Sequence, residues 1–112
     1  MITASLAQNL EYNEAKPAIS VLFQTESTKE IRILMRKGQF MNEHKTPYPI
    51  VVELFDGTLD FGVNGETHNL VKGDMLTLAG NVPHDLKATS DCTVRLSLSI
   101  KDKVERVEAV VK

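Results

Sequence analysis

The sequence predicts an all-β protein of antiparallel strands, and three features of its pattern lead to this prediction. Apolar residues alternate with other residues along most of the chain, at the two-residue period of a β-strand. Asn64-Gly65 is the strongest two-residue hairpin signal, and Asp56-Gly57 and Gly73-Asp74 mark further turns. Short strands with turns every eight to twelve residues or so are typical of a sandwich or a barrel.

The strands are expected where this alternation holds. In chain order they are residues 18–24, 31–36, 50–55, 58–63, 66–72, 75–78 and 92–100, with a loop at 79–83. In the first strand, Ile19, Val21 and Phe23 alternate with Ser20, Leu22 and Gln24. Residues 50–55 are apolar on both faces, which indicates a more buried strand, and Asp56-Gly57 is expected to turn it back as a hairpin.

The Asn64-Gly65 turn also predicts a register. A two-residue loop pairs Val63 with Glu66. Counting back from that pair places Phe61 opposite His68, and Leu59 opposite Leu70. His68 is therefore expected to share a face with apolar residues.

The last residues have a different pattern. Asp102 and Glu105 have the spacing of a capping box, and Val104, Val107 and Val111 recur at helical intervals. This predicts a short helix over residues 103–111. A final strand is the competing interpretation, because valine favours strands.

The composition narrows the class of protein. A chain of 112 residues with 42% apolar and 25% charged residues fits one globular domain, residues 1–112. A net charge of −2 argues against nucleic acid as a partner. The N-terminus lacks the pattern of an export signal, and the chain has no apolar stretch near the roughly 20 residues of a membrane helix. A single cysteine, Cys92, excludes an internal disulfide and is expected to be a small buried strand residue. We therefore expect a cytoplasmic protein without a membrane partner.

Two segments carry a family resemblance. The first runs from Gly38 over five residues to His44-Lys45-Thr46 and on to Gly57. The second runs from Gly73-Asp74 through a short strand and a turn to Pro83-His84. In this order they resemble the two motifs of the cupin superfamily, and the resemblance covers about residues 31–97. It implies an antiparallel double-stranded β-helix, a jelly-roll barrel.

In metal-binding cupins, two histidines and a glutamate of the first motif and one histidine of the second hold a metal inside the barrel. On this resemblance His44 takes the first histidine position and His84 the last. Thr46 stands where the second histidine belongs, and Ile50 where the glutamate belongs. Two of the four ligands are therefore missing, and the site is degenerate. Glu53 is a poor substitute, because strand parity points it away from Ile50.

The resemblance and the strand parity together give a set of candidate site residues. The expected ligand-binding residues are His44, Thr46, Tyr48, Ile50, His68 and His84. His44 and His84 should point inward with their rings within about 5 Å of each other, close enough to share one metal ion or water. Such a pair could hold a divalent transition metal (Zn, Ni, Fe or Mn), but only weakly, because tight sites use three or four protein ligands.

Three functional interpretations remain open from the sequence. The first is a binding module that holds a small organic ligand in a mostly apolar pocket. The second is a metal-dependent enzyme of isomerase or dioxygenase type with a reduced ligand set. The third is a module that assembles with itself or a partner. The chain is also expected to form a homodimer through residues 1–24, since self-pairing is a common way to cover edge strands.

Overall fold

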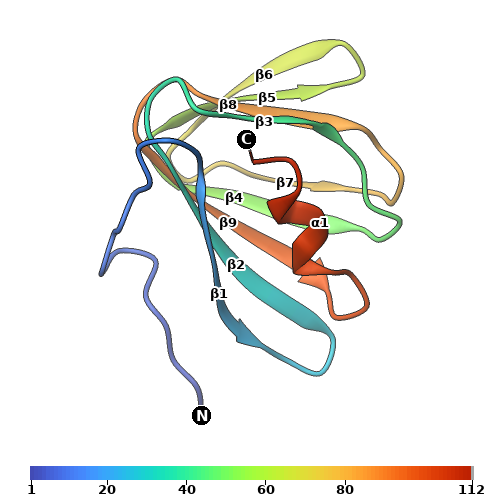
Figure 1. Cartoon of the computed structure of the whole chain (residues 1–112). Helices are drawn as coiled ribbons and strands as arrows, with labels where there is room; N and C mark the ends of the chain where they lie inside the picture. Colours follow the sequence, from blue (N-terminus) through green and yellow to red (C-terminus); the bar gives the residue numbers. More distant parts are fainter. Residues whose placement is uncertain (112) are drawn as a thin grey trace.

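The computed structural model describes residues 1–111, apart from the side chain of Glu105. In this part of the chain nine strands form two antiparallel sheets that pack face to face (Figure 1). The five-stranded sheet has the order β1-β2-β9-β4-β7, with bounds Ala18–Gln24, Thr28–Met35, Cys92–Ser99, Ile50–Asp56 and Met75–Leu78. The four-stranded sheet has the order β3-β8-β5-β6, with bounds Phe40–His44, His84–Ala88, Thr58–Val63 and Glu66–Val71. The predicted all-β jelly roll is confirmed.

The core lies between the two sheets and follows the predicted alternation. On β4, Ile50, Val52 and Leu54 are at most 3% exposed and face inward. Glu53 lies on the opposite face, where its carboxylate accepts a hydrogen bond from Arg95. Side chains from both sheets therefore fill the interior, as sheet-on-sheet packing requires.

The hairpin at Asn64-Gly65 is confirmed. Both residues have positive φ, 53° and 77°, as a type I′ turn requires. The register of β5 and β6 is the predicted one, with Val63 opposite Glu66 and Phe61 opposite His68.

The prediction of a hairpin at Asp56-Gly57 is wrong. β4 belongs to the five-stranded sheet and β5 to the four-stranded sheet, so Gly57 turns a corner between the sheets. Gly57 has a φ of +89°, and a Cβ there would lie 2.3 Å from the carbonyl oxygen of Asp91. The sequence does signal a sharp turn here, but a tight turn alone does not say that the two strands pair.

The first strand departs from simple alternation. The pairing of β1 with β2 shifts between Val21 and Phe23, so Val21 lies opposite Ile31 whereas Phe23 lies opposite Glu30. This bulge moves Phe23 to the outer face of the sheet, because a one-residue shift reverses the direction of every later side chain. Ile19 alone of the three predicted apolar positions on β1 packs against the core.

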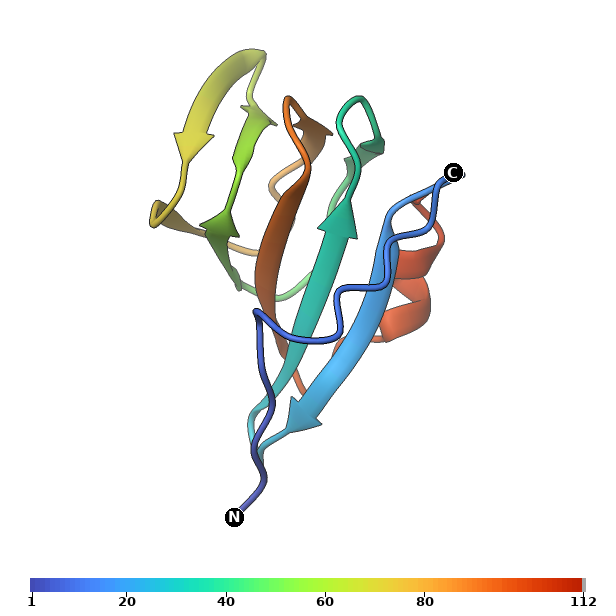
Figure 2. The same cartoon turned by 90° about the vertical axis from the view of Figure 1, so that its left-hand side faces the viewer.

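The N-terminal segment crosses the outer face of the five-stranded sheet (Figure 2). Arg32 on β2 holds it there: its Nη1 donates to the carbonyl oxygens of Ser5 and Gln8, and its Nη2 to that of Asn9. Arg32 is 8% exposed, and among the described residues its Nε has no hydrogen-bond partner. Backbone dipoles thus take the place of a carboxylate beside this guanidinium.

Cys92 is the small buried strand residue that the sequence predicts. It is 1% exposed at the start of β9. Burial, followed by the nearby charges of Asp91 and Asp56, raises the pKa of its thiol to about 12. The thiol is therefore protonated at neutral pH, which does not suit a nucleophile.

The chain ends in a short helix, α1 (Val104–Glu108), inside the predicted range of 103–111. The competing prediction of a final strand is wrong. Asp102 precedes the helix as expected, whereas the Glu105 side chain that would complete the capping box lies outside the described part of the structure. Across residues 1–111, no helix has the length and apolar character needed to cross a membrane.

Candidate ligand-binding site

Two histidines meet between the sheets at one end of the barrel. His44 ends β3 and His84 begins β8, and the register of these strands places the two residues opposite each other. Their ring centroids are 4.3 Å apart at an interplanar angle of 60°. The ring of His84 also stacks on Phe61, with a centroid distance of 5.6 Å and an angle of 7°. The two imidazoles are thus as close as the two motifs imply.

Backbone carbonyl groups fix the protonation pattern of both rings. The Nδ1 of His44 lies 2.6 Å from the carbonyl oxygen of Asn42, and the Nδ1 of His84 lies 2.9 Å from that of Val82. A carbonyl oxygen only accepts, so each Nδ1 must carry the proton and donate. In the neutral rings each Nε2 then keeps a free lone pair, which can bind a ligand donor or a metal ion.

His44 is held in its neutral form. Burial lowers the pKa of His44, the hydrogen bond to Asn42 opposes this, and the nearby His84 lowers it further while Asp85 raises it. The pKa of His44 is lowered overall, because removing the imidazolium from water costs more free energy than the hydrogen bond to Asn42 and the charge of Asp85 return. His44 therefore presents a neutral ring to the pocket at neutral pH.

This shift predicts a pH dependence of stability. The unfolded chain binds the His44 proton near the ordinary pKa of 6.5, whereas the folded protein binds it only at lower pH. Stability should therefore fall as the pH is lowered through about 6.5 and level off below the folded pKa. Urea unfolding of the wild type and of the His44→Asn variant at pH 7, 6 and 5 measures the change in unfolding free energy. The His68→Asn variant is the control, because the His68 side chain is exposed. The prediction is contradicted if the stability of the His44→Asn variant falls with pH as steeply as that of the wild type.

The pocket around the two rings is small and only partly open to solvent. Its lining combines the histidines with apolar side chains and the end of the chain: His44, Thr46, Ile50, His84, Leu96, Leu98, Asp102, Arg106 and Val107. Its free volume is about 20 Å³. This is room for one water molecule or one ion, whereas pockets for organic ligands usually measure about 300–1,000 Å³.

Helix α1 covers the pocket. Figure 1 shows it in the opening between the two sheets. Val107 projects into the core at 6% exposure, and Asp102 is 2% exposed. The Thr46 hydroxyl donates to Oδ2 of Asp102, and Arg106 Nε donates to Oδ1 at 2.9 Å. A carboxylate is therefore present in the pocket, although it comes from the last segment of the chain and not from the position of Ile50.

The structure brings together four of the six predicted site residues. His44, Thr46, Ile50 and His84 all line the pocket. Tyr48 is half-buried in the adjoining loop, where its amide lies 3.5 Å from the Thr46 hydroxyl, and it is not among the lining residues. The ligand-binding roles of these residues remain predictions.

His68 lies away from this pocket. Its side chain is 53% exposed and its Nε2 is 3.9 Å from a carboxylate oxygen of Glu66. The predicted pairing with Phe61 is correct, but β6 is the edge strand of its sheet and most of it is exposed. Sharing a face with core residues is therefore not enough to bury a side chain on an edge strand.

Sequence reasoning misses the contribution of the chain end to the site. The pattern predicts Asp102 only as a helix cap and Val107 only as part of an apolar stripe, and it predicts no role for Arg106. The available signal is the cap itself: a carboxylate followed by valines at helical spacing indicates a helix that packs its apolar side on the barrel. Nothing in the local sequence indicates where it packs.

The donor set does not fit a tightly bound metal. Within residues 1–111 no group of three or more His, Cys, Asp or Glu side chains is arranged to hold an ion. The two Nε2 atoms are suitable ligands, but Ile50 is apolar and Asp102 is engaged by Thr46 and Arg106. Zinc and non-haem iron sites use at least three protein ligands. The residues therefore fit weak binding at most.

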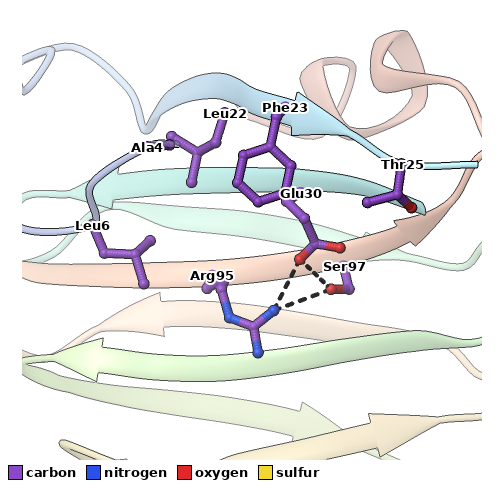
Figure 3. A pocket seen from close by; sticks show the side chains of 8 residues that line it. All are labelled: Ala4, Leu6, Leu22, Phe23, Thr25, Glu30, Arg95 and Ser97. Atoms are coloured by element: carbon purple, nitrogen blue, oxygen red, sulfur yellow. Dashed lines mark hydrogen bonds and ion pairs between the residues drawn. The ribbon is translucent and has the colours of Figure 1, made fainter. Parts of the chain in front are cut away.

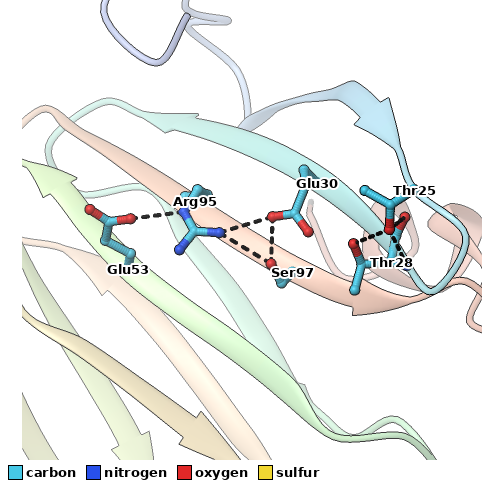
Figure 4. Close-up of polar contacts among 6 residues, drawn as sticks. All are labelled: Thr25, Thr28, Glu30, Glu53, Arg95 and Ser97. Carbon is cyan, nitrogen blue, oxygen red and sulfur yellow. Dashed lines mark hydrogen bonds and ion pairs between the residues drawn. The ribbon is translucent and has the colours of Figure 1, made fainter. Parts of the chain in front are cut away.

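A second hollow lies on the outer face of the five-stranded sheet (Figure 3). It has a volume of about 390 Å³ and is lined by Ala4, Leu6, Leu22, Phe23, Thr25, Glu30, Arg95 and Ser97. Its floor is an ion-pair network in which Arg95 donates to Glu30 at 2.9 Å and to Glu53 at 2.8 Å (Figure 4). Burial would raise the pKa of Glu30, but hydrogen bonds from Ser97, Thr28 and Arg95 together lower it. Because Arg95 and its carboxylates satisfy one another, this hollow offers a ligand fewer free polar groups than the barrel pocket.

Comparisons with known proteins support the fold. No protein-family model and no curated protein sequence matches the chain. Solved structures do match. An RmlC-like cupin protein from Desulfovibrio desulfuricans is 17% identical, with a TM-score of 0.81 over 88% of this chain and 96% of its own. An RmlC-like cupin from Shewanella frigidimarina is 15% identical, with a TM-score of 0.79 over 93% and 94%. KdgF from a Halomonas species is 15% identical, with a TM-score of 0.71 over 86% and 93%. The chain has the cupin fold.

Proposed function

We propose that this cupin-fold protein binds a small organic ligand in its barrel pocket, without a tightly held metal. The observation that supports this most directly is the pair of imidazoles, 4.3 Å apart, whose Nδ1 atoms both lie against backbone carbonyl oxygens. Two Nε2 lone pairs are thereby directed to one small space in an otherwise apolar barrel. A few convergent polar groups in an apolar concavity are typical of a ligand site.

The lining suggests the chemistry of the ligand. The two Nε2 atoms are acceptors, so they favour a ligand with hydroxyl donors. Ile50, Leu96 and Leu98 favour an apolar body. Since the pocket has a free volume of only about 20 Å³, a ligand larger than one water molecule requires α1 to move outward.

Ligand binding can be tested through the histidines themselves. Small hydroxylated compounds that bind should slow the modification of His44 and His84 by diethyl pyrocarbonate, as measured by mass spectrometry. The exposed His68 provides an internal reference, because its rate should not change. His84→Asn should abolish binding of any compound found this way, and His68→Asn should not. Binding that survives in His84→Asn would contradict the proposal.

A weakly held divalent metal is the second candidate, favoured by the same two Nε2 atoms. We expect sub-stoichiometric Zn, Ni, Fe or Mn after purification, removable by mild chelation with little change in the melting temperature. Burying a dication without a carboxylate ligand in a low-dielectric barrel is costly, which is why occupancy should be low. Elemental analysis before and after chelation measures this. Full occupancy by a tightly held metal would overturn it and favour a metal-dependent enzyme.

We also propose that the chain forms a homodimer through its N-terminal region. β1 is an edge strand, and Val21 on it is 42% exposed. Unpaired strand edges favour self-association, and a two-fold axis closes it at two copies. Light scattering at micromolar concentration should give twice the chain mass of 12.5 kDa. A monomer mass would rule the dimer out.

A further inference from the structure

We propose that the hollow on the outer face of the five-stranded sheet binds a neutral, planar aromatic compound (Figure 3). This hollow shares no lining residue with the barrel pocket, so the proposal is independent of the function proposed for that pocket. Its volume of about 390 Å³ falls within the range of about 300–1,000 Å³ that is usual for small-molecule sites. Its walls, its floor and its balance of charge all favour this class of ligand.

The bulge in β1 supplies an apolar wall. The pairing of β1 with β2 shifts between Val21 and Phe23, and the consecutive residues Leu22 and Phe23 both line the hollow. In a regular strand only one of these two could do so, because consecutive side chains point to opposite faces of the sheet. Bulges are common beside functional sites, where they redirect a side chain. This bulge directs two neighbouring apolar side chains outward, and they leave a surface that an aromatic ring can cover.

The N-terminal segment supplies another wall, and Arg32 holds it in place. Ala4 and Leu6 line the hollow, and the carbonyl oxygen of Ser5 between them accepts a hydrogen bond from Arg32 Nη1 at 3.1 Å. Arg32 is 8% exposed on β2, so it attaches this segment to the sheet. The hollow is therefore already formed before a ligand arrives, and binding need not order a loop.

On the floor of the hollow, Arg95 presents the flat side of its guanidinium group. Its Nε donates to Glu53 at 2.8 Å, and its Nη1 donates to Glu30 at 2.9 Å and to Ser97 at 3.2 Å. Because these N–H groups point outward in the plane of the guanidinium, their partners lie around its edge and do not cover its face. Figure 3 shows this face toward the viewer, with the ring of Phe23 nearby. The side chain of Arg95 is 27% exposed, and a guanidinium face stacks favourably on an aromatic ring.

The charges around the hollow favour a neutral ligand. Arg95 is paired with the carboxylates of Glu30 and Glu53, and Arg32 lies opposite Arg95 on the adjacent strand. These two cations and two anions cancel. In the described part of the chain, an ionic ligand would find no unpaired charge among the residues that line the hollow. It would lose hydration without gaining an ion pair, whereas a neutral ring would not.

Indole is a suitable probe of this site, because the chain contains no tryptophan. Its fluorescence can therefore be excited selectively, and it should change in a saturable way as protein is added. Indole-3-acetate and tryptamine carry the same ring with a negative or a positive charge. Indole should bind at least about fivefold more tightly than either, because neither charge has a free partner in the hollow.

Two conservative variants locate the binding. Arg95→Lys keeps the positive charge beside Glu30 and Glu53 but removes the flat guanidinium, and it should weaken indole binding by roughly threefold or more. Phe23→Leu keeps an apolar side chain but removes the ring, and it should weaken binding by a similar factor. Phe40→Leu is the matched control, since Phe40 is 47% exposed on β3 of the other sheet and does not line the hollow. It should leave indole binding unchanged.

The contrary outcomes are distinct from one another. Absence of saturable binding, or unchanged affinity in Arg95→Lys or Phe23→Leu, would overturn the site. Tighter binding of either ionic compound would overturn the neutral class of ligand. Indole that slows the modification of His44 and His84 by diethyl pyrocarbonate would occupy the barrel pocket instead, which would overturn this proposal and support the ligand site in the barrel. A dimer mass that falls in light scattering as indole is added would mean that a second copy occupies the hollow, and it would overturn the small-molecule ligand.

Discussion

Replacing Ile50 with glutamate should destabilise the protein by about 3–5 kcal/mol at neutral pH, because an unpaired carboxylate would be buried. Ile50 is 3% exposed and lines the same pocket as Asp102. The new charge would lie near an existing carboxylate whose partners, Thr46 and Arg106, are already engaged. Urea unfolding at pH 7 measures the loss.

Two controls separate charge from shape at this position. Ile50→Met preserves volume and polarity and should cost less than about 1.5 kcal/mol. Ile50→Gln buries a polar group without charge and should fall between the two. A glutamate variant as stable as the methionine variant would show that the pocket tolerates a second carboxylate. The expected weakness of metal binding would then need another explanation.

Adding Thr46→His to Ile50→Glu should reverse part of this loss when metal is present. The double variant would have the full cupin ligand set, because the two substitutions add a histidine and a glutamate to the existing His44 and His84. We expect nickel or zinc affinity to rise by at least about a hundredfold over the wild type, since four protein ligands replace two. Isothermal titration and melting with and without metal would measure it. Both new side chains are larger or more polar than the small pocket allows, so α1 should also become more exposed to hydrogen exchange.

The second large effect is expected at the corner between the sheets. Gly57→Ala should destabilise the protein by at least about 3 kcal/mol, because φ is +89° and the new methyl group would lie 2.3 Å from the Asp91 carbonyl oxygen and 2.6 Å from Cys92 Cβ. Both neighbours belong to the turn into β9 and the start of that strand, which have little freedom to move. Chemical unfolding would measure the change.

Gly38→Ala is the matched control for this corner. Gly38 has a φ of +91°, but no heavy atom lies within 4 Å of a Cβ built there. The Gly38→Ala variant should lose only about 1 kcal/mol of stability, which is the cost of a positive φ for alanine. Equal losses at the two glycines would mean that the close approach to Asp91 contributes nothing.

The parts of the fold that depend on local pattern could be predicted from the sequence. The inward face of β4 and the register of the Asn64-Gly65 hairpin follow from alternation and turn chemistry alone. The proximity of His44 and His84 follows from the motif spacing. These predictions succeed because each feature is decided within a few residues, or by a resemblance that already contains the fold.

The failures share a different physical cause. The pattern does not predict β3 and β8, which carry the two histidines, as strands, because Phe40–His44 and His84–Ala88 contain few β-branched residues. Pairing with neighbouring strands makes them extended despite this composition. The corner at Gly57, the exposure of His68 and the inward position of Asp102 likewise depend on which distant segment lies opposite. A pattern along the chain carries little of that information.

The sheet order has a consequence for how the chain acquires its structure during synthesis. β9 lies between β2 and β4, and β8 lies between β3 and β5, so each sheet has one of its central strands near the end of the sequence. A nascent chain that has not yet reached Ser99 lacks the β9 partner of both β2 and β4, and their apolar faces stay uncovered. Folding must therefore wait until nearly all of these residues have left the ribosome, and proteins dominated by such distant pairings fold slowly. During that interval the unpaired strands depend on dilution or on chaperones to avoid association.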